Sequence, residues 1–359
     1  MRSCTGRRSS SVIDREVIPP QYAAYITFFR AIGAVLITNS HFTGVYPSDI
    51  VANGGLLGDV MFFAAAGYSL NPRGGFPGWY LRRIIRVYIP VWFVTIGYLL
   101  IGWYSAREAS LRWWLVYPTN YHFIASIMVL YVPMVIAVKL AWVRDRLAGV
   151  IALVAVAHAV LYLIAYDANY YHIDNVREPM IRLLFLEAML VGAYFRHRPR
   201  ASVAPKPASW VLLVATGFGY AGTKFALVSG LLAPAFQIAN HWLIMGFLYL
   251  LLVTMGDLEG SLRALPASVQ RVAVFIAGMT LEIYLVQYAI IPLIAPALIF
   301  PCNWVALVIC IGTLAWGLIG FRNRWSVGQL PGLLLSPNAM GCSRRPELLT
   351  QIVVEVVAK

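Results

Sequence analysis

YAAYITFFRAIGAVLITNSHF, residues 22–42, is the stretch from which the fold of this chain can be read. It is about as long as the roughly 20 apolar residues that a helix needs to cross a bilayer. It carries one Arg, Arg30, and a polar group near its end, Asn39, Ser40 and His41. The stretch therefore predicts a membrane-spanning helix with an arginine inside it.

The rest of the 359-residue chain has the same apolar character. Hydrophobic residues make up 60% of it and charged residues only 12%, whereas a soluble domain carries about 25% charged residues. The mean hydropathy is +0.73. The net charge of +13 resides mostly in short segments between apolar runs, which is typical of membrane topology. Composition excludes a disordered chain, a nucleic-acid-binding module and an ordinary soluble enzyme, and it predicts a polytopic membrane protein.

Ten apolar segments follow one another, so we expect an all-α membrane protein with about ten transmembrane helices in one bundle. They cover residues 22–42, 50–70, 84–104, 121–142, 147–166, 180–196, 209–228, 231–255, 271–299 and 303–321. The ninth contains Pro292 and Pro296, which predict a kink or a break there. We expect a cytoplasmic N-terminal segment at residues 1–21, a membrane domain at 22–321 and a poorly ordered cytoplasmic tail at 322–359.

Basic residues are distributed unevenly between the predicted loops. The outer loops and edges hold only Arg107, Arg112, Arg177, Arg182 and Lys224, if the N-terminus is placed inside. Most other Lys and Arg residues then fall on the inner side. Because short cytoplasmic loops are enriched in Lys and Arg, both termini are predicted to be cytoplasmic. We expect an integral protein of a bacterial cytoplasmic membrane, in contact with membrane lipid and not with nucleic acid.

Arg30 is the sharpest outlier among the apolar residues. A charge at mid-membrane costs about 2.5–3.5 kcal/mol on insertion scales, so Arg30 needs a compensating partner. His41 lies eleven positions later, about 1100° of helix, or three turns plus about 20°. The two residues therefore share one face, roughly 16 Å apart along the axis. Either they form a functional pair, or Arg30 snorkels to the surface and His41 is an interfacial residue.

Asp59 is buried in the second apolar segment among many small residues. Small residues let membrane helices approach closely. A carboxylate here is a candidate partner for Arg30 or His41, because pairing reduces the burial penalty of each group. As a structural residue, Asp59 would instead cap a helix at the outer interface.

Arg82, Arg83 and Arg86 stand where the third predicted span begins. Arg82 and Arg86 are one helical turn apart, with Arg83 beside them. Guanidinium groups bind phosphates in bidentate fashion, so the three residues are candidates for binding a phosphate-bearing ligand. As topology anchors, they would contact lipid headgroups instead.

Several further polar residues in the predicted spans are weaker candidates. A substrate pocket would draw on Asn39, Glu187, Glu282 and Tyr284. Carboxylates inside a membrane are functional or paired by default. The histidines at 122, 158 and 241 lack the spacing of metal ligands, so we expect no bound metal. The sequence has no GxSxG or Walker A motif, so soluble-type hydrolase and ATPase chemistry have no support.

Taken together, these residues resemble the acyltransferase-3 family of integral membrane O-acyltransferases, the type that O-acetylates polysaccharides and other glycans. Arg30 and His41 have the family's spacing in the first helix. Residues 59–70 are similar to its Phe-Phe-x-x-Ser-Gly stretch, and residues 79–90 to its Arg-Arg-x-x-Arg segment followed by Tyr and Pro. Residues 280–287 are similar to its late Glu-Ile-Tyr-Leu-x-His helix, and residues 120–131 match more loosely. Two positions depart: Ala66 stands for the usual Ser, and Gln287 for a frequent His.

The resemblance implies an enzyme that moves an acyl group, usually acetyl, from cytoplasmic acyl-CoA to a hydroxyl group. The acceptor would be a cell-surface glycan, an exopolysaccharide or a lipid-linked sugar, often on the outer side of the membrane. Acyl-CoA, above all acetyl-CoA, would be a co-substrate, with no cofactor bound permanently.

The resemblance also implies roles for single residues. His41 would be the base, because neutral imidazole near pH 7 suits the activation of a sugar hydroxyl, and Asp59 or Asn39 would orient it. Arg30 would stabilise developing negative charge or hold a donor phosphate or carbonyl oxygen. The CoA phosphates would lie against Arg82, Arg83 and Arg86.

A membrane transporter or flippase for a sugar or lipid is the alternative reading. Such a protein also places polar residues along an aqueous path, and Arg30, Asp59, Glu187 and Glu282 are available for that purpose. The sequence shows no internal repeat, which disfavours a transporter built on inverted repeats. A non-catalytic membrane scaffold is the third reading.

Overall fold

The structure is a computed structural model that describes most of the chain between residues 18 and 328. The described residues are 18, 22–72, 75–105, 107, 109–116, 121–167, 169–173, 175, 179–197 and 207–328, with side chains up to residue 320. Nearly all of the predicted N-terminal segment at 1–21 and the part of the predicted tail after residue 328 lie outside these ranges. The last helix continues to Gly328, past the predicted end of the membrane domain at residue 321.

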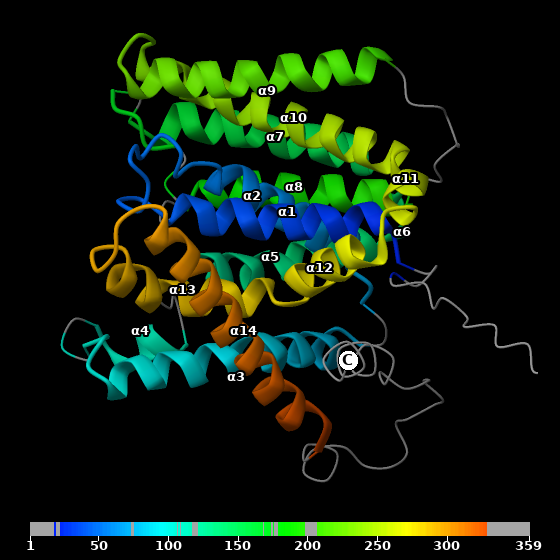
Figure 1. Cartoon of the computed structure of the whole chain (residues 1–359). Coiled ribbons are helices and arrows are strands. Elements are labelled where there is room, and N and C mark those ends of the chain that lie inside the picture. The colour runs from blue at the N-terminus through cyan, green and yellow to red at the C-terminus, as the bar shows by residue number, and fades with distance from the viewer. Residues whose placement is uncertain are drawn as a thin grey trace, which may run out of the picture.

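Across the described residues the protein is all-α, as predicted. Its helices are α1 (Ala24–Ser40), α2 (Gly55–Tyr68), α3 (Phe76–Leu100), α4 (Leu111–Leu115), α5 (His122–Lys139), α6 (Ala141–Arg144), α7 (Leu147–Ala165), α8 (Ile181–His197), α9 (Pro207–Val228), the 3-10 turn η1 (Pro234–Phe236), α10 (Gln237–Asp257), α11 (Glu259–Arg263), α12 (Ala267–Gly278), α13 (Thr280–Ile294) and α14 (Cys302–Gly328). Most long helices run side by side, with α6 and α11 at one end of the bundle and α4 at the other (Figure 1).

Several of these helices have the length and composition of membrane spans. Six in the described ranges qualify: α3, α5, α7, α9, the run Pro234–Asp257, and Cys302–Gly320 within α14. The pair α12 and α13 qualifies as one bent span, and α1 and α2 are shorter apolar helices. Every predicted span falls on a helix or a helix pair, whereas the count of ten crossings stays a prediction. The outer helices expose large apolar side chains, such as Leu153 at 68% and Phe218 at 77%, which suits contact with lipid.

The centre of the bundle is a close stack of α1, α2 and α8. Glycine makes this approach possible, because a Cβ atom on Gly67 of α2 would collide with the backbone of Met189 in α8. A Cβ atom on Gly192 of α8 would likewise collide with the backbone of Ala64. Gly33 and Gly58 bring α1 and α2 together in the same way, as the small residues of the second apolar segment predicted. This stack fixes α1, which carries Arg30 and His41.

The ninth predicted span has its sharp bend away from its prolines. The chain bends by 70° between α12 and α13, at Met279, whereas Pro292 lies inside α13. Helix α13 ends at Ile294, two residues before Pro296, so the chain does leave the helix at its prolines as predicted, whereas the 70° bend at Met279 was not predicted. The bend leaves the carbonyl of Ala277 available at the end of α12, where Thr280 Oγ1 donates to it at 3.1 Å. Arg30 satisfies the same carbonyl from α1, so the break is stabilised by tertiary contacts and not by proline.

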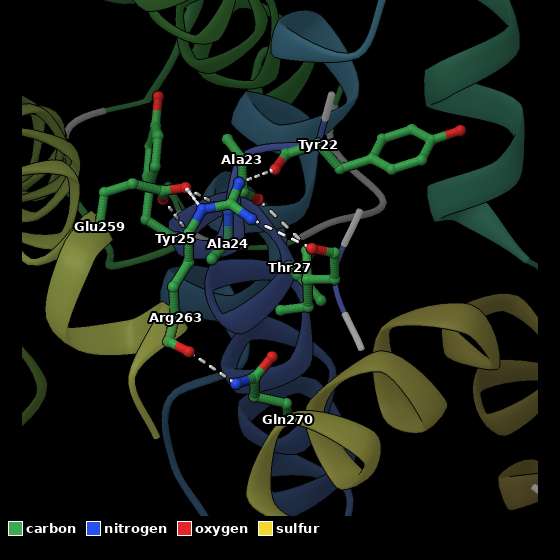
Figure 2. A network of polar contacts seen from close by, with 9 residues as sticks. Tyr22, Ala23, Ala24, Tyr25, Thr27, Glu259, Arg263 and Gln270 are labelled. Carbon is green, nitrogen blue, oxygen red and sulfur yellow. Dashed lines mark hydrogen bonds and ion pairs between the residues drawn. The ribbon is translucent and has the colours of Figure 1, made fainter. Parts of the chain in front are cut away.

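The start of α1 is held by a network that we call the α1 clasp, formed by Glu259, Arg263 and Gln270 (Figure 2). Glu259 accepts hydrogen bonds from the backbone N–H groups of Ala24 at 2.9 Å and Tyr25 at 2.8 Å. A carboxylate stabilises a helix N-terminus because it satisfies unpaired N–H groups and complements the helix dipole.

Arg263 completes the clasp from α11. Its Nε donates to Glu259 at 2.8 Å, its Nη1 donates to the carbonyl of Ile18 at 3.0 Å, and its Nη2 donates to that of Tyr22. The amide of Gln270 in turn donates to the carbonyl of Arg263 at 2.8 Å. The clasp ties the beginning of α1 to the segment between α10 and α12.

Candidate functional site

One face of α1 lines a narrow cavity between the two ends of the bundle. Ala34, Ile37 and Thr38 form this face, between Arg30 on one side and His41 on the other. Phe62 of α2, Phe123 of α5 and four residues of α13 close the cavity: Thr280, Leu281, Ile283 and Tyr284. The cavity measures about 20 Å³, room for roughly one water molecule. The shared face expected from the spacing of Arg30 and His41 is therefore the wall of an internal cavity.

Arg30 occupies the end of this face nearer the clasp. It is half-buried, and its Nη2 donates a hydrogen bond of 2.9 Å to the carbonyl of Ala277. That carbonyl belongs to the last turn of α12, where a cation is favoured by the unpaired carbonyls and the negative end of the helix dipole. The positive charge of Arg30 is thus compensated by a group inside the protein. Arg30 does not have to reach the membrane surface for this compensation.

Further charges surround Arg30. Arg83 and Arg86 of α3, the carboxylate of Glu282 in α13 and the phenol of Tyr131 in α5 all lie within electrostatic range of its guanidinium group. Glu282 is fully buried. Cations from two helices therefore converge around one carboxylate at this end of the cavity, and we call this group the cationic cluster. It is built from residues of α1, α3, α5 and α13.

The three predicted arginines of α3 do not behave alike. Arg83 turns inward, where its guanidinium group lies 5.4 Å from the ring centre of Trp79 and 5.6 Å from that of Tyr131. Arg82 and Arg86, one turn apart, are exposed. A guanidinium group against two aromatic rings is held by cation–π attraction, which fixes its direction. Arg83 and Arg86 are among the charges that act on Arg30, so they belong to the cationic cluster. Arg82 is not among those charges and lies outside the cluster.

His41 marks the other end of the cavity. It follows the last residue of α1, and its ring meets that of Tyr288 edge to face at 5.2 Å. The hydroxyl of Tyr288 donates to that of Tyr284 at 3.1 Å, and both rings contact the fully buried Tyr121. Sequence reasoning named Tyr284 but missed Tyr288 and Tyr121. The one available signal was the spacing of Tyr284 and Tyr288, which are four apart on one helix face.

Asp59 and Asn39, the two residues predicted to orient His41, contact other groups in the structure. Asp59 is buried in α2, yet among the described residues it forms no hydrogen bond or ion pair with His41 or Arg30. Asp59 lies within electrostatic range of Tyr284 instead. The Asn39 amide donates to the carbonyls of Val51 and Asn53 at 2.7 and 3.0 Å. Its side chain holds the loop between α1 and α2, so it is structural.

Glu187 lies in a separate cluster and not at the cavity. Its Oε1 is 2.9 Å from Nδ1 of His158, and the ring of His158 is 5.2 Å from that of His241. All three side chains are buried, between α7, α8 and α10. Within the described ranges no group of three or more His, Cys, Asp or Glu residues has the geometry of a metal site. Sequence reasoning had named these residues separately, because nothing in a single helix shows which helices will pack.

The arrangement has two chemically distinct ends. The cationic cluster suits an anionic ligand, and His41 provides an imidazole roughly 16 Å away along α1. The guanidinium group of Arg30 and the imidazole of His41 contact different groups, Ala277 and Tyr288. The two side chains therefore do not meet at one point of the structure.

The comparisons with known proteins give one match. The model of a family described as an acyltransferase domain matches residues 23–322, which include α1, the cationic cluster and the whole cavity. No curated protein matches the chain. No solved structure matches it either.

Proposed function

The chain belongs to the acyltransferase-3 family and is a membrane acyltransferase, and on that premise we propose that it moves an acyl group, acetyl above all, from acyl-CoA to a hydroxyl group of a glycan. The acceptor would be a cell-surface glycan, an exopolysaccharide or a lipid-linked sugar. Membrane lipid surrounds the bundle, and no permanently bound cofactor takes part. The protein would reside in the cytoplasmic membrane of a bacterium with both termini inside.

One observation carries this proposal. The face of α1 that lines the cavity runs between Arg30 of the cationic cluster and His41, so a group of cations and a candidate base lie at the two ends of one helix face. Acyl-CoA is a long molecule with several phosphates at one end and the thioester at the other. A protein that binds such a donor needs cations for the phosphates at a distance from the base that acts at the thioester. The cationic cluster and His41 are placed in this way.

The cationic cluster would bind the donor. Arg83 and Arg86 would contact CoA phosphates, because guanidinium groups form bidentate charged hydrogen bonds with phosphate oxygens. Arg30 lies deeper and would hold a donor oxygen next to the thioester arm. Arg82, which is exposed at the same end, would attract the donor by its charge.

His41 would act as the base of the transfer. Its imidazole takes the proton of the acceptor hydroxyl, and the hydroxyl oxygen attacks the thioester carbonyl carbon. The carbon–sulfur bond then breaks, and the imidazolium returns the proton to the leaving CoA thiolate. Tyr288 packs against the imidazole ring and would fix its orientation in place of Asp59 or Asn39.

The test uses the purified full-length protein in detergent, acetyl-CoA labelled on the acetyl group, and a crude glycan fraction as acceptor. We expect label in the glycan with wild type and a loss of about 10²–10⁴-fold with His41→Ala, the range for removal of one general base. Transport of unmodified sugar in vesicles, with no labelled glycan, would contradict the proposal and favour a transporter.

A further inference from the structure

Gln287 in α13 is a buried polar side chain whose amide has no partner. Its exposed fraction is 0%, and among the described residues neither its Oε1 nor its Nε2 has a hydrogen-bond partner. Leaving a buried amide unpaired is costly, and such groups in native proteins call for an explanation. A ligand that presents polar atoms at this position would satisfy both atoms.

The position of Gln287 on its helix leads to the cavity. It follows Thr280 by seven residues, which is about 700° of helix, so the two directions differ by only about 20°. Ile283 and Tyr284 point to either side of that direction, and all three of these neighbours line the cavity. The next residue, Tyr288, contacts the ring of His41. Gln287 is not itself part of the cavity lining; it lies on the same face of α13, about one turn beyond Tyr284 and next to Tyr288, which contacts His41.

The other buried glutamines among the described residues, Gln237 and Gln270, form hydrogen bonds through their side chains, which makes Gln287 unusual there. The Gln237 oxygen accepts from the backbone N–H groups of His172 at 2.9 Å and Ile173 at 3.0 Å. Its amide nitrogen donates to the carbonyl of Tyr170 at 3.0 Å. Gln270 likewise donates to two carbonyls in the clasp region. The fold thus pairs such side chains where their role is structural.

We propose that Gln287 is a catalytic residue whose Nε2–H donates a hydrogen bond to the acyl carbonyl oxygen as that oxygen becomes an anion. This inference rests on the proposed acyl transfer. When the acceptor oxygen attacks the thioester carbon, the carbonyl π electrons move to the oxygen, and they return as the carbon–sulfur bond breaks. Amide donors aimed at such an oxyanion are a recurrent source of rate acceleration. Arg30 is bound to Ala277 three turns from His41, so it does not fill this role.

The test is Gln287→Met, which keeps the length of the side chain and removes the donor. We expect kcat to fall about 10²–10³-fold, the range for loss of one oxyanion donor, with the donor KM changed only a few-fold. The unfolding midpoint should stay equal or rise, because an unpaired buried amide has been replaced by an apolar group. Gln287→Leu repeats the test with a second apolar side chain, so that one packing failure does not decide the result.

Gln237→Met is the matched control. It removes a buried amide that holds three backbone groups, so we expect a lower unfolding midpoint with kcat per folded molecule retained. The inference is wrong if wild type is active and both Gln287 variants keep near wild-type kcat, or if they only lose stability as Gln237→Met does. A wild-type protein that transfers no acyl group from any acyl-CoA contradicts the proposed function itself, which is a different outcome.

Discussion

Among single residues, Arg30 shows most directly how this protein accommodates a charge in an apolar bundle. Its guanidinium group bonds to the carbonyl at the end of α12 and lies among the charges of Arg83, Arg86 and Glu282. The planar, multidentate shape of the group suits several partners at once, and an ammonium group does not replace it. Arg30 therefore links α1 to α12 in the structure, and in the proposed mechanism the same side chain also holds the donor.

Arg30→Lys should lower the rate of acyl transfer at least about tenfold. An ammonium group that bonds to the Ala277 carbonyl cannot present the planar fork of donors with which a guanidinium group binds a second partner. The measurement is the rate at saturating and at limiting acyl-CoA, together with expression in the membrane. A snorkelling residue would behave otherwise, since Lys snorkels as well as Arg. Full activity in the Lys variant would therefore favour a mere surface anchor.

Alanine variants of the three arginines of α3 should differ in their apparent KM for acyl-CoA. Arg83→Ala and Arg86→Ala remove members of the cationic cluster, and each charged contact with phosphate contributes about 1.5–3 kcal/mol. The apparent KM for acyl-CoA should then rise about tenfold or more, at about 1.4 kcal/mol per decade.

Arg82→Ala is the comparison within the same helix. It should raise the donor KM less, because Arg82 is not among the charges that act on Arg30, whereas Arg83 and Arg86 are. The acceptor KM should change little in all three variants. Equal and unchanged donor KM values would remove the CoA-binding role from the cluster.

Among helices, the contact between α2 and α8 is the tightest in the bundle, and it makes a stability prediction. Gly192→Ala places a methyl group against the backbone of Ala64, so helix α8 must move away from α2. Overpacking of this kind costs about 1–3 kcal/mol. We expect a lower unfolding midpoint in detergent and a loss of activity that follows the loss of folded protein.

Gly246→Ala is the control for this contact. Gly246 lies in α10, and a Cβ atom there meets no atom within 4 Å. Alanine is the better helix former by about 1 kcal/mol, so the variant should be neutral or slightly stabilised. If both variants have the same midpoint, close packing at Gly192 is not a source of stability.

The same helices show what a sequence can predict and what it cannot. The spans and the shared face of Arg30 and His41 follow from local patterns, apolar length and the 100° step of a helix. Next to the break at Met279, the carbonyl of Ala277 is bonded by Arg30, 247 positions before Ala277, and no local pattern contains this contact. The pairing of Glu187 with His158 and the contact of His41 with Tyr288 likewise depend on which helices pack together.

For the whole molecule, the distribution of basic residues predicts an orientation that labelling can test. In a cysteine-free background, Ser48→Cys lies in the exposed loop between α1 and α2, and Ser261→Cys lies in α11 at the opposite end of α1. An impermeant thiol reagent should label Ser48→Cys in intact cells. It should label Ser261→Cys only after the cells are opened.

The reverse pattern would place the cationic cluster outside, away from acyl-CoA. The proposed donor site would then be wrong, whatever the activity of single variants. Labelling of both positions in intact cells would mean that α1 does not separate the two compartments, which contradicts its role as a span.

The hydrogen bond between Arg30 and Ala277 also imposes an order of events on biosynthesis. The two residues are 247 positions apart, and ribosomes add roughly 5–20 residues per second. The first helix therefore exists for about 10–50 seconds before its acceptor carbonyl has been made. The carboxylate that holds the start of α1, Glu259, is also late, 235 positions after Ala24. During that interval α1 lacks the two contacts that hold it in the folded protein. The last third of the chain thus completes the packing of the first helix, and a chain that stops before residue 259 lacks both contacts.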